Sequence, residues 1–115
     1  MKKYALVLLF AVAQSALAVP LTLAEFKQQS NQHYSTLESK QAALNSALDQ
    51  KQHPSVLIEK ACSYSMGLKA FKNFAKQNQH LTYAQEEYAF IQQLDEKFDL
   101  SLNDLGTSYE KGCLK

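Results

Sequence analysis

Residues 54–77, PSVLIEKACSYSMGLKAFKNFAKQ, decide the fold of this chain. Pro54 suits the first turn of a helix, and the residue before a proline disfavours helical backbone, so we expect a helix to begin here. Apolar side chains recur around much of its circumference, at positions 56, 57, 58, 61, 62, 64, 66, 68, 71, 74 and 75. The segment is therefore predicted to be the central and most buried helix, in which Gly67 would allow another helix to cross closely.

A long helix is predicted before this segment, over residues 23–50. Thr22 and Glu25 form a capping-box pattern, in which the threonine hydroxyl accepts from a backbone N–H and the glutamate reaches back to the cap. A thin and partly polar seam then recurs at spacings of three and four: Leu23, Phe26, Ser30, His33 or Tyr34, Leu37, Gln41, Leu44 and Leu48. This spacing is typical of a helix with one face turned toward a core.

Two further helices are predicted after the central one. Thr82 and Gln85 repeat the capping-box pattern, and the third helix is expected to end near Phe98. Ser101 or Asn103 would then cap a short fourth helix. No alternating strand pattern occurs in the sequence. The predicted fold class is therefore all-α, a small bundle of about four helices.

The first eighteen residues resemble an export signal. A positive start (MKK) precedes an uninterrupted apolar stretch over residues 5–13, and Ala16 and Ala18 supply the A-x-A pattern of a signal-peptidase site. The apolar stretch is too short to span a bilayer as a permanent helix. We expect a signal peptide over residues 1–18 and a single helical domain over residues 19–115. The mature protein would then be periplasmic or secreted, without a membrane span.

Cys62 and Cys113 are the two cysteines of the chain. An even number of cysteines in an exported protein predicts a disulfide. The bond would close a loop of about 50 residues, which contributes on the order of 4 kcal/mol in the chain-entropy model. The sequence contains no C-x-x-C motif, so a structural disulfide is favoured over a redox or metal-binding pair.

Composition and spacing argue against several classes of function. All 12 basic residues are lysine, against 11 acidic ones, so the chain has no arginine fork for phosphate or bases, and we expect no nucleic-acid partner. His33, His53 and His80 lie in three separate segments without metal-ligand spacing, and each is predicted to be a surface or turn residue. No nucleophile elbow is present. We therefore expect no enzyme activity, no metal and no cofactor.

A basic stripe is the clearest charged feature of the central helix. Lys69, Lys72 and Lys76 follow one another at i, i+3 and i+7. Between Glu86 and Asp104 the chain carries six carboxylates and one lysine. The two sets could be complementary rims of antiparallel neighbours, or the lysines could form a face that steers an acidic partner.

Two aromatic residues are candidates for a binding surface. Phe74 and Phe90 lie off the cleanest apolar stripes, so they are predicted to contribute to an exposed patch or an apolar groove. With the basic stripe, they complete the residues predicted to bind a partner protein.

A short motif suggests one alternative function. Residues 81–85, LTYAQ, are similar to the LTxxQ motif of helical periplasmic stress chaperones, and residues 21–25, LTLAE, are a near match with glutamate in place of glutamine. The resemblance covers ten residues, and each copy is also a leucine followed by a capping box. It implies a chaperone with broad clients and assigns no family.

The favoured hypothesis is a small exported non-enzymatic helical protein that binds another protein, as an inhibitor, an immunity protein or an adaptor. The stress chaperone is one alternative. The other is a carrier of a small apolar ligand, whose cavity between helices would be lined by Phe71, Phe74, Phe90 and Met66.

Overall fold

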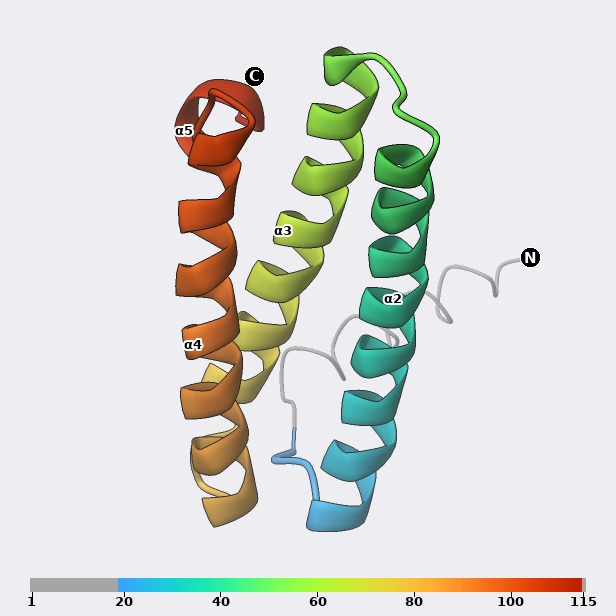
Figure 1. Ribbon diagram of the computed structural model, residues 1–115. Helices are drawn as coiled ribbons and strands as arrows, with labels where there is room; N and C mark the ends of the chain where they lie inside the picture. The colour runs from blue at the N-terminus through green and yellow to red at the C-terminus, as the bar shows by residue number, and fades with distance from the viewer. Residues whose placement is uncertain (1–18, 115) are drawn as a thin grey trace, which may run out of the picture.

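The computed structural model describes residues 19–114, which fold into four helices without a strand in that range. Their bounds are Leu23–Asp49 for α2, Pro54–Lys76 for α3, Thr82–Asp104 for α4 and Tyr109–Gly112 for α5 (Figure 1). The predicted all-α bundle with three long helices and a short fourth is confirmed. The predicted signal peptide lies outside the described residues.

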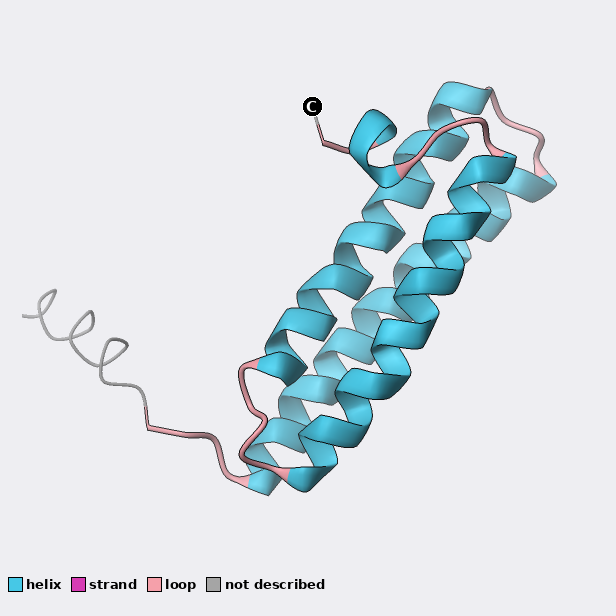
Figure 2. Ribbon diagram, turned by 90° about the vertical axis from the view of Figure 1, so that its left-hand side faces the viewer, coloured by secondary structure: helices cyan, strands magenta, loops and turns pink. Residues whose placement is uncertain are grey.

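Helix α3 is the central element of the bundle. It packs against α2 on one side and α4 on the other, and it also contacts α5. The three long helices run side by side, and the chain after α4 crosses one end of the bundle to reach α5 (Figure 2). The central position predicted for the segment that begins at Pro54 is confirmed.

Local signals set the starts of the first two long helices. The Glu25 backbone N–H donates to the Thr22 hydroxyl at 3.1 Å, and the Thr22 N–H donates to the Glu25 carboxylate at 2.9 Å, so the predicted capping box is confirmed. Pro54 occupies the first turn of α3, as predicted. His53 caps that helix, because its Nδ1 accepts from the Ser55 backbone N–H at 3.1 Å.

The capping box predicted at the start of α4 does not form. Leu81 is the N-cap residue and has no side-chain capping bond, while Thr82 already lies in the helix. The Gln85 side-chain amide donates to the Gln79 carbonyl at 2.7 Å instead of returning to the cap. The same spacing that forms a capping box at the start of α2 therefore forms none here.

The predicted end of the third helix is also wrong. Helix α4 continues past Phe98 to Asp104, and the Ser101 hydroxyl donates to the Lys97 carbonyl at 3.2 Å instead of capping a new helix. Leu102 is fully buried, so packing against the rest of the core favours the extra turns.

Gly106 ends α4, in the stretch after Asn103 where a short fourth helix was predicted. Gly106 adopts a φ of 79°, which glycine tolerates because it has no Cβ that would clash with the backbone. The Thr107 N–H donates to the Leu102 carbonyl at 3.2 Å and the Gly106 N–H to Asn103 at 2.9 Å, the pair of bonds of a Schellman motif. The short α5 then begins at Tyr109, capped by the Ser108 hydroxyl.

The core runs along the bundle as three clusters of buried side chains. They are Phe26, Ala75 and Ala84 at one end, Leu37, Leu68, Phe71 and Ile91 in the middle, and Leu44, Ala61 and Leu102 at the other end. Each cluster takes members from α2, α3 and α4, so burial of these side chains holds all three long helices together.

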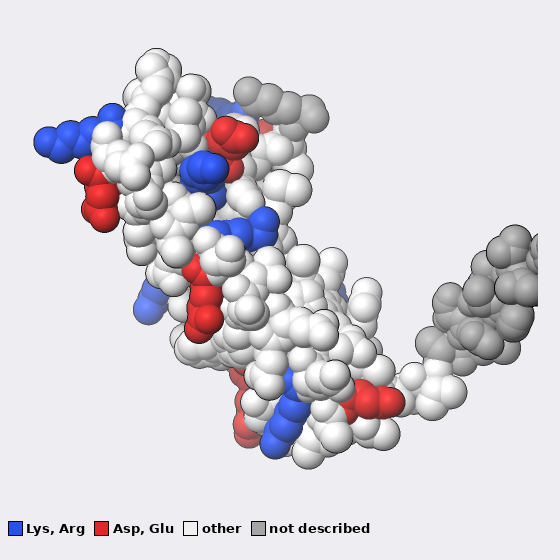
Figure 3. Space-filling model, turned by 90° about the vertical axis from the view of Figure 1, so that its right-hand side faces the viewer, with Lys and Arg blue, Asp and Glu red and all other residues white. Residues whose placement is uncertain are grey.

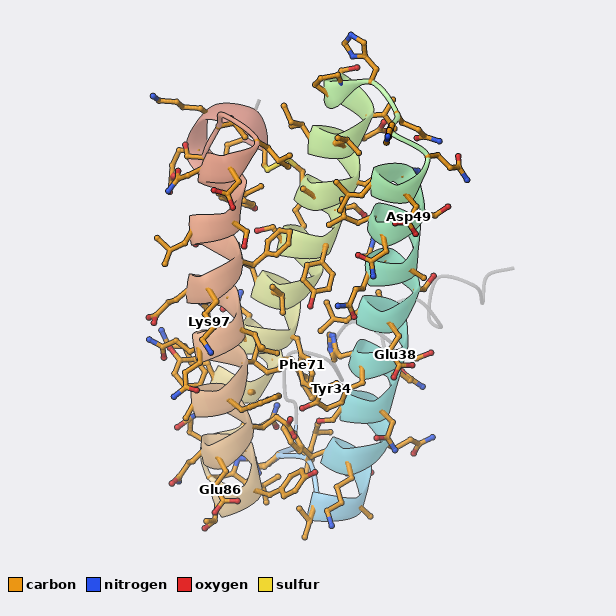
Figure 4. All side chains as sticks on the ribbon, viewed as in Figure 1. Tyr34, Glu38, Asp49, Phe71, Glu86 and Lys97 are labelled. Carbon is orange, nitrogen blue, oxygen red and sulfur yellow. A yellow bond between two sulfur atoms is a disulfide. The ribbon has the colours of Figure 1, made fainter. Side chains whose placement is uncertain are left out.

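A buried polar contact joins α2 to α4. The Tyr34 hydroxyl donates to the carboxylate of Glu87, which is itself buried. Burial and the bond to Glu87 raise the pKa of Tyr34 above its ordinary value. Figure 4 shows Tyr34 and Phe71 directed into the space between the helices. Four labelled charged residues are exposed on the outside of the bundle in the same view: Glu38, Asp49, Glu86 and Lys97.

The disulfide between Cys62 and Cys113 is confirmed, with a Cα–Cα distance of 5.4 Å. It fastens the end of α5 to the middle of α3. Within residues 19–114, no helix has the length and apolar content needed to cross a bilayer.

Candidate binding groove

Packing of α2 and α4 leaves the outer face of α3 uncovered, and an open groove of about 820 Å³ runs along it. Its floor is one helical stripe of α3: Ser55, Ile58, Glu59, Cys62, Ser63, Met66, Gly67 and Ala70. Its walls are His33, Thr36 and Lys40 of α2 and, at the other side, Gly112 and Cys113. The floor residues recur at spacings of three and four, so the groove follows the axis of α3.

The floor of the groove is largely uncharged for an exposed helix face. Met66 is 53% exposed, and Ala70 is also exposed beside it. Among the described lining residues, Lys40 and Glu59 carry the charges. Lys40 Nζ donates to the Ser63 hydroxyl at 2.7 Å. Neither Lys40 nor Glu59 forms an ion pair with another residue of the described range 19–114.

Gly67 sets how closely α2 approaches the floor of the groove. A Cβ at this position would lie 3.0 Å from Leu37 Cδ2 and 3.4 Å from Lys40 Cδ. The close helix crossing predicted for this glycine is therefore confirmed. It lays the aliphatic part of Lys40 across α3, and this brings the ammonium group of Lys40 over the groove.

His33 lies in the α2 wall and is half-buried, so its prediction as a plain surface residue is wrong. Its ring lies 4.9 Å from the ring of Phe71, stacked at 9°, and 4.9 Å from that of Phe74. Burial lowers the pKa of His33, which favours a neutral imidazole. The sequence signal for this burial is its position in the seam of α2, four residues before Leu37.

The basic stripe is only partly available to a partner. Lys69 and Lys72 reach the buried carboxylate of Asp95 at 2.7 and 2.8 Å, and Lys69 also reaches Asp99 at 3.2 Å. The interpretation as complementary rims of neighbouring helices is therefore confirmed for these two lysines. Lys76 is exposed and forms no ion pair within residues 19–114. The partner-binding role of the stripe stays a prediction.

Lys69 connects three helices. Its ammonium group lies 4.3 Å from the centre of the Tyr109 ring of α5 while it binds Asp95 and Asp99 of α4. Burial lowers the pKa of Lys69, but the hydrogen bonds that its ammonium group donates to the two aspartates outweigh this, and the net pKa is raised. The lysine is therefore held in its charged form.

The two aromatic candidates lie apart from each other and from the groove. Phe74 is half-buried and stacks on Phe26 at 4.8 Å, whereas Phe90 is 50% exposed on α4. Phe71 is fully buried. The predicted cavity of Phe71, Phe74, Phe90 and Met66 therefore does not form, and of these four Met66 alone lines the groove. The reason is that Phe71 and Phe74 turn toward α2, on the inner side of α3.

The side of the molecule formed by α2 carries scattered side chains of both charges and a mostly uncharged surface between them (Figure 3). In the part of the chain that the structure describes, no three His, Cys, Asp or Glu side chains gather as a metal site would require. The groove along α3, with a volume of about 820 Å³, is therefore taken as the candidate binding site.

Neither a model of a known protein family, nor a curated protein, nor a solved structure matches this chain.

Proposed function

We propose that this is an exported, non-enzymatic protein that binds another protein in the groove along α3. The observation that carries the proposal is the uncovered stripe of small and apolar side chains on the outer face of the central helix. An inhibitor, an immunity protein or an adaptor would use such a surface. Exposed apolar surface of this kind is costly in water and is often a site of interaction.

The dimensions of the groove suit a protein segment. Its floor extends from Ser55 to Ala70, which corresponds to about 22 Å of helix at 1.5 Å per residue. This length matches about four turns of a partner helix, and an apolar helix face in a hydrophobic groove is a common mode of peptide recognition.

Two features support export. The Cys62–Cys113 bond needs an oxidising compartment to persist, and the periplasm and the extracellular space provide one. The first eighteen residues carry the pattern of a signal peptide. Mass measurement of the protein exported from a bacterial host is expected to give a chain that begins at Val19.

The test of the binding site uses two variants with the same chemical change. Ala70→Glu puts a carboxylate on the groove floor, while Ala89→Glu puts one on an exposed position of α4 outside the groove. Each full-length protein is produced with its own leader, purified in oxidised form and used to capture partners from a periplasmic extract.

We expect wild type and Ala89→Glu to retain one dominant partner near 1:1, and Ala70→Glu to lose it. Equal capture by all three proteins would contradict the groove as the site. A broad set of abundant proteins, unaffected by either variant, would favour the stress-chaperone alternative.

A carrier function is the second candidate, favoured by one observation. The groove volume of about 820 Å³ lies within the range of about 300–1,000 Å³ found for small-molecule sites. Native mass spectrometry of the exported protein would detect a retained ligand. A bound mass that Ala70→Glu removes would support the carrier over the protein-binding function.

A further inference from the structure

We infer that the occupant of the groove is an amphipathic helix that places an acidic side chain against Lys40 and a basic side chain against Glu59, about one turn apart. This inference rests on the proposed function and specifies the chemistry of the partner.

The groove favours a helix over an extended segment. Its floor and walls are built mainly from α2 and α3, whose backbone N–H and C=O groups are already paired within each helix. A strand laid on this floor would find no backbone partners, and its own polar groups would lose water without compensation. A helix satisfies its backbone internally, so it covers the floor without that cost.

The small side chains of the floor suit close packing by a helix. Ser63, Gly67 and Ala70 project little from α3, and Met66 offers a flexible apolar contact beside them. Methionine adapts to irregular surfaces because its side chain is unbranched and polarizable. A partner helix with leucine and alanine on one face would match this floor.

The two charged lining groups determine the polar part of the partner. Lys40 Nζ binds the Ser63 hydroxyl, and Glu59 precedes Ser63 by four residues, so positions 59 and 63 are about one helical turn, roughly 6 Å, apart along α3. Neither has an ion-pair partner within residues 19–114. Covering them with an apolar surface would cost free energy through lost hydration, whereas opposite charges on the partner would offset that loss.

The experiment uses three synthetic 20-residue amphipathic helices with the same leucine and alanine face. They differ at two flanking positions one turn apart, which carry an acid and a base, two acids, or two bases. Fluorescence anisotropy measures their binding to the oxidised protein. Wild type is expected to bind the acid–base peptide about fivefold more tightly than the other two, since one exposed charge pair contributes up to about 1 kcal/mol.

Charge reversal should switch this preference. Lys40→Glu leaves two acids beside the groove and should then prefer the two-base peptide, while Glu59→Lys should prefer the two-acid peptide. Glu59 is exposed, so its reversal leaves the fold intact even if Lys40→Glu destabilises the crossing of α2 over α3. Circular dichroism of each variant checks its folding.

The outcomes separate the two proposals. Equal binding of the three peptides by wild type and by Glu59→Lys would overturn the charge assignment and leave a helix-binding groove. Absence of binding by any peptide, with a captured partner still lost in Ala70→Glu, would overturn the helical occupant but support the proposed function. Peptide binding that Ala70→Glu leaves unchanged would place the peptide outside the groove and overturn the helical occupant, whereas the proposed function is overturned by partner capture that Ala70→Glu leaves unchanged.

Discussion

At the scale of single residues, Asp95 has the most demanding environment in the molecule. Its side chain is 3% exposed, yet it accepts from the ammonium groups of both Lys69 and Lys72. A buried carboxylate is tolerated only when opposite charges and hydrogen bonds compensate its lost hydration. Here the two lysines remain 27% and 30% exposed, so they reach inward to the carboxylate while retaining some water.

We predict that Asp95→Asn lowers the free energy of unfolding by on the order of 2–3 kcal/mol, because it removes the charge between two lysines and keeps the shape. The matched control is Asp99→Asn, whose side chain is 43% exposed and should cost less than about 1 kcal/mol. Urea unfolding followed by circular dichroism measures both variants. If both variants lost similar amounts of unfolding free energy, the burial of Asp95 would not be the reason for its contribution to stability.

At the scale of helices, the approach of α2 to α3 determines the shape of the groove. Gly67 lies where the Leu37 and Lys40 side chains cross α3, and the missing Cβ makes room for them. The end of α4 depends in a similar way on Gly106, whose positive φ stops the helix after the buried Leu102. These two glycines therefore place the α2 wall and the loop that leads to α5.

Substitution at position 67 tests the crossing. Gly67→Ala should change stability by less than about 1 kcal/mol, because the helix propensity gained offsets the cost of a 3.0 Å contact with the Leu37 Cδ2 methyl group. Gly67→Val should destabilise by about 1–3 kcal/mol, since a larger side chain forces Leu37 and Lys40 away. Thermal unfolding compares the two variants.

The control for this series is Ala70→Val, at an exposed position one turn further along α3. It introduces the same β-branched residue into the same helix without the crossing, so only the modest propensity cost is expected. If Gly67→Val and Ala70→Val were equally stable, the close crossing would not limit the packing of α2.

At the scale of the whole molecule, the disulfide links the last helix to the central one. The bonded cysteines are 51 residues apart, and the loop between them includes part of α3, all of α4, the turn after it and all of α5. Helix α5 has four residues and none of them is buried, so its own packing holds it weakly. The covalent link therefore keeps it beside α3, where Gly112 and Cys113 form one wall of the groove.

We predict that Cys62→Ser lowers the free energy of unfolding by on the order of 4 kcal/mol, because the unfolded chain regains the freedom of the long loop. For a domain of this size the melting temperature should fall by about 15–30 °C. Cys113→Ser should cost about the same, and the double variant no more than either, since one bond is removed in each case. Wild type melted in reductant should match the variants; an unchanged melting temperature would contradict a stabilising bond.

Sequence alone determined the helical class, the three long helices, the first capping box, the start of α3 and the cysteine pairing. These features depend on local periodicity, on proline and capping chemistry, and on a cysteine count with only one possible pair. The Thr82 capping box and the helix end near Phe98 were predicted wrongly, because local patterns at those places compete with packing of buried residues such as Leu102.

Only the tertiary structure decided which surfaces remain available. The pairing of Lys69 and Lys72 with Asp95, the stacking of His33 on Phe71 and the uncovered face of α3 all join residues from different helices. An amphipathic pattern shows that a helix has an inner face, but the neighbours that cover its flanks depend on how the helices cross. For this reason the periodicity of α3 predicted its burial, and the packing of α2 and α5 around it produced the groove.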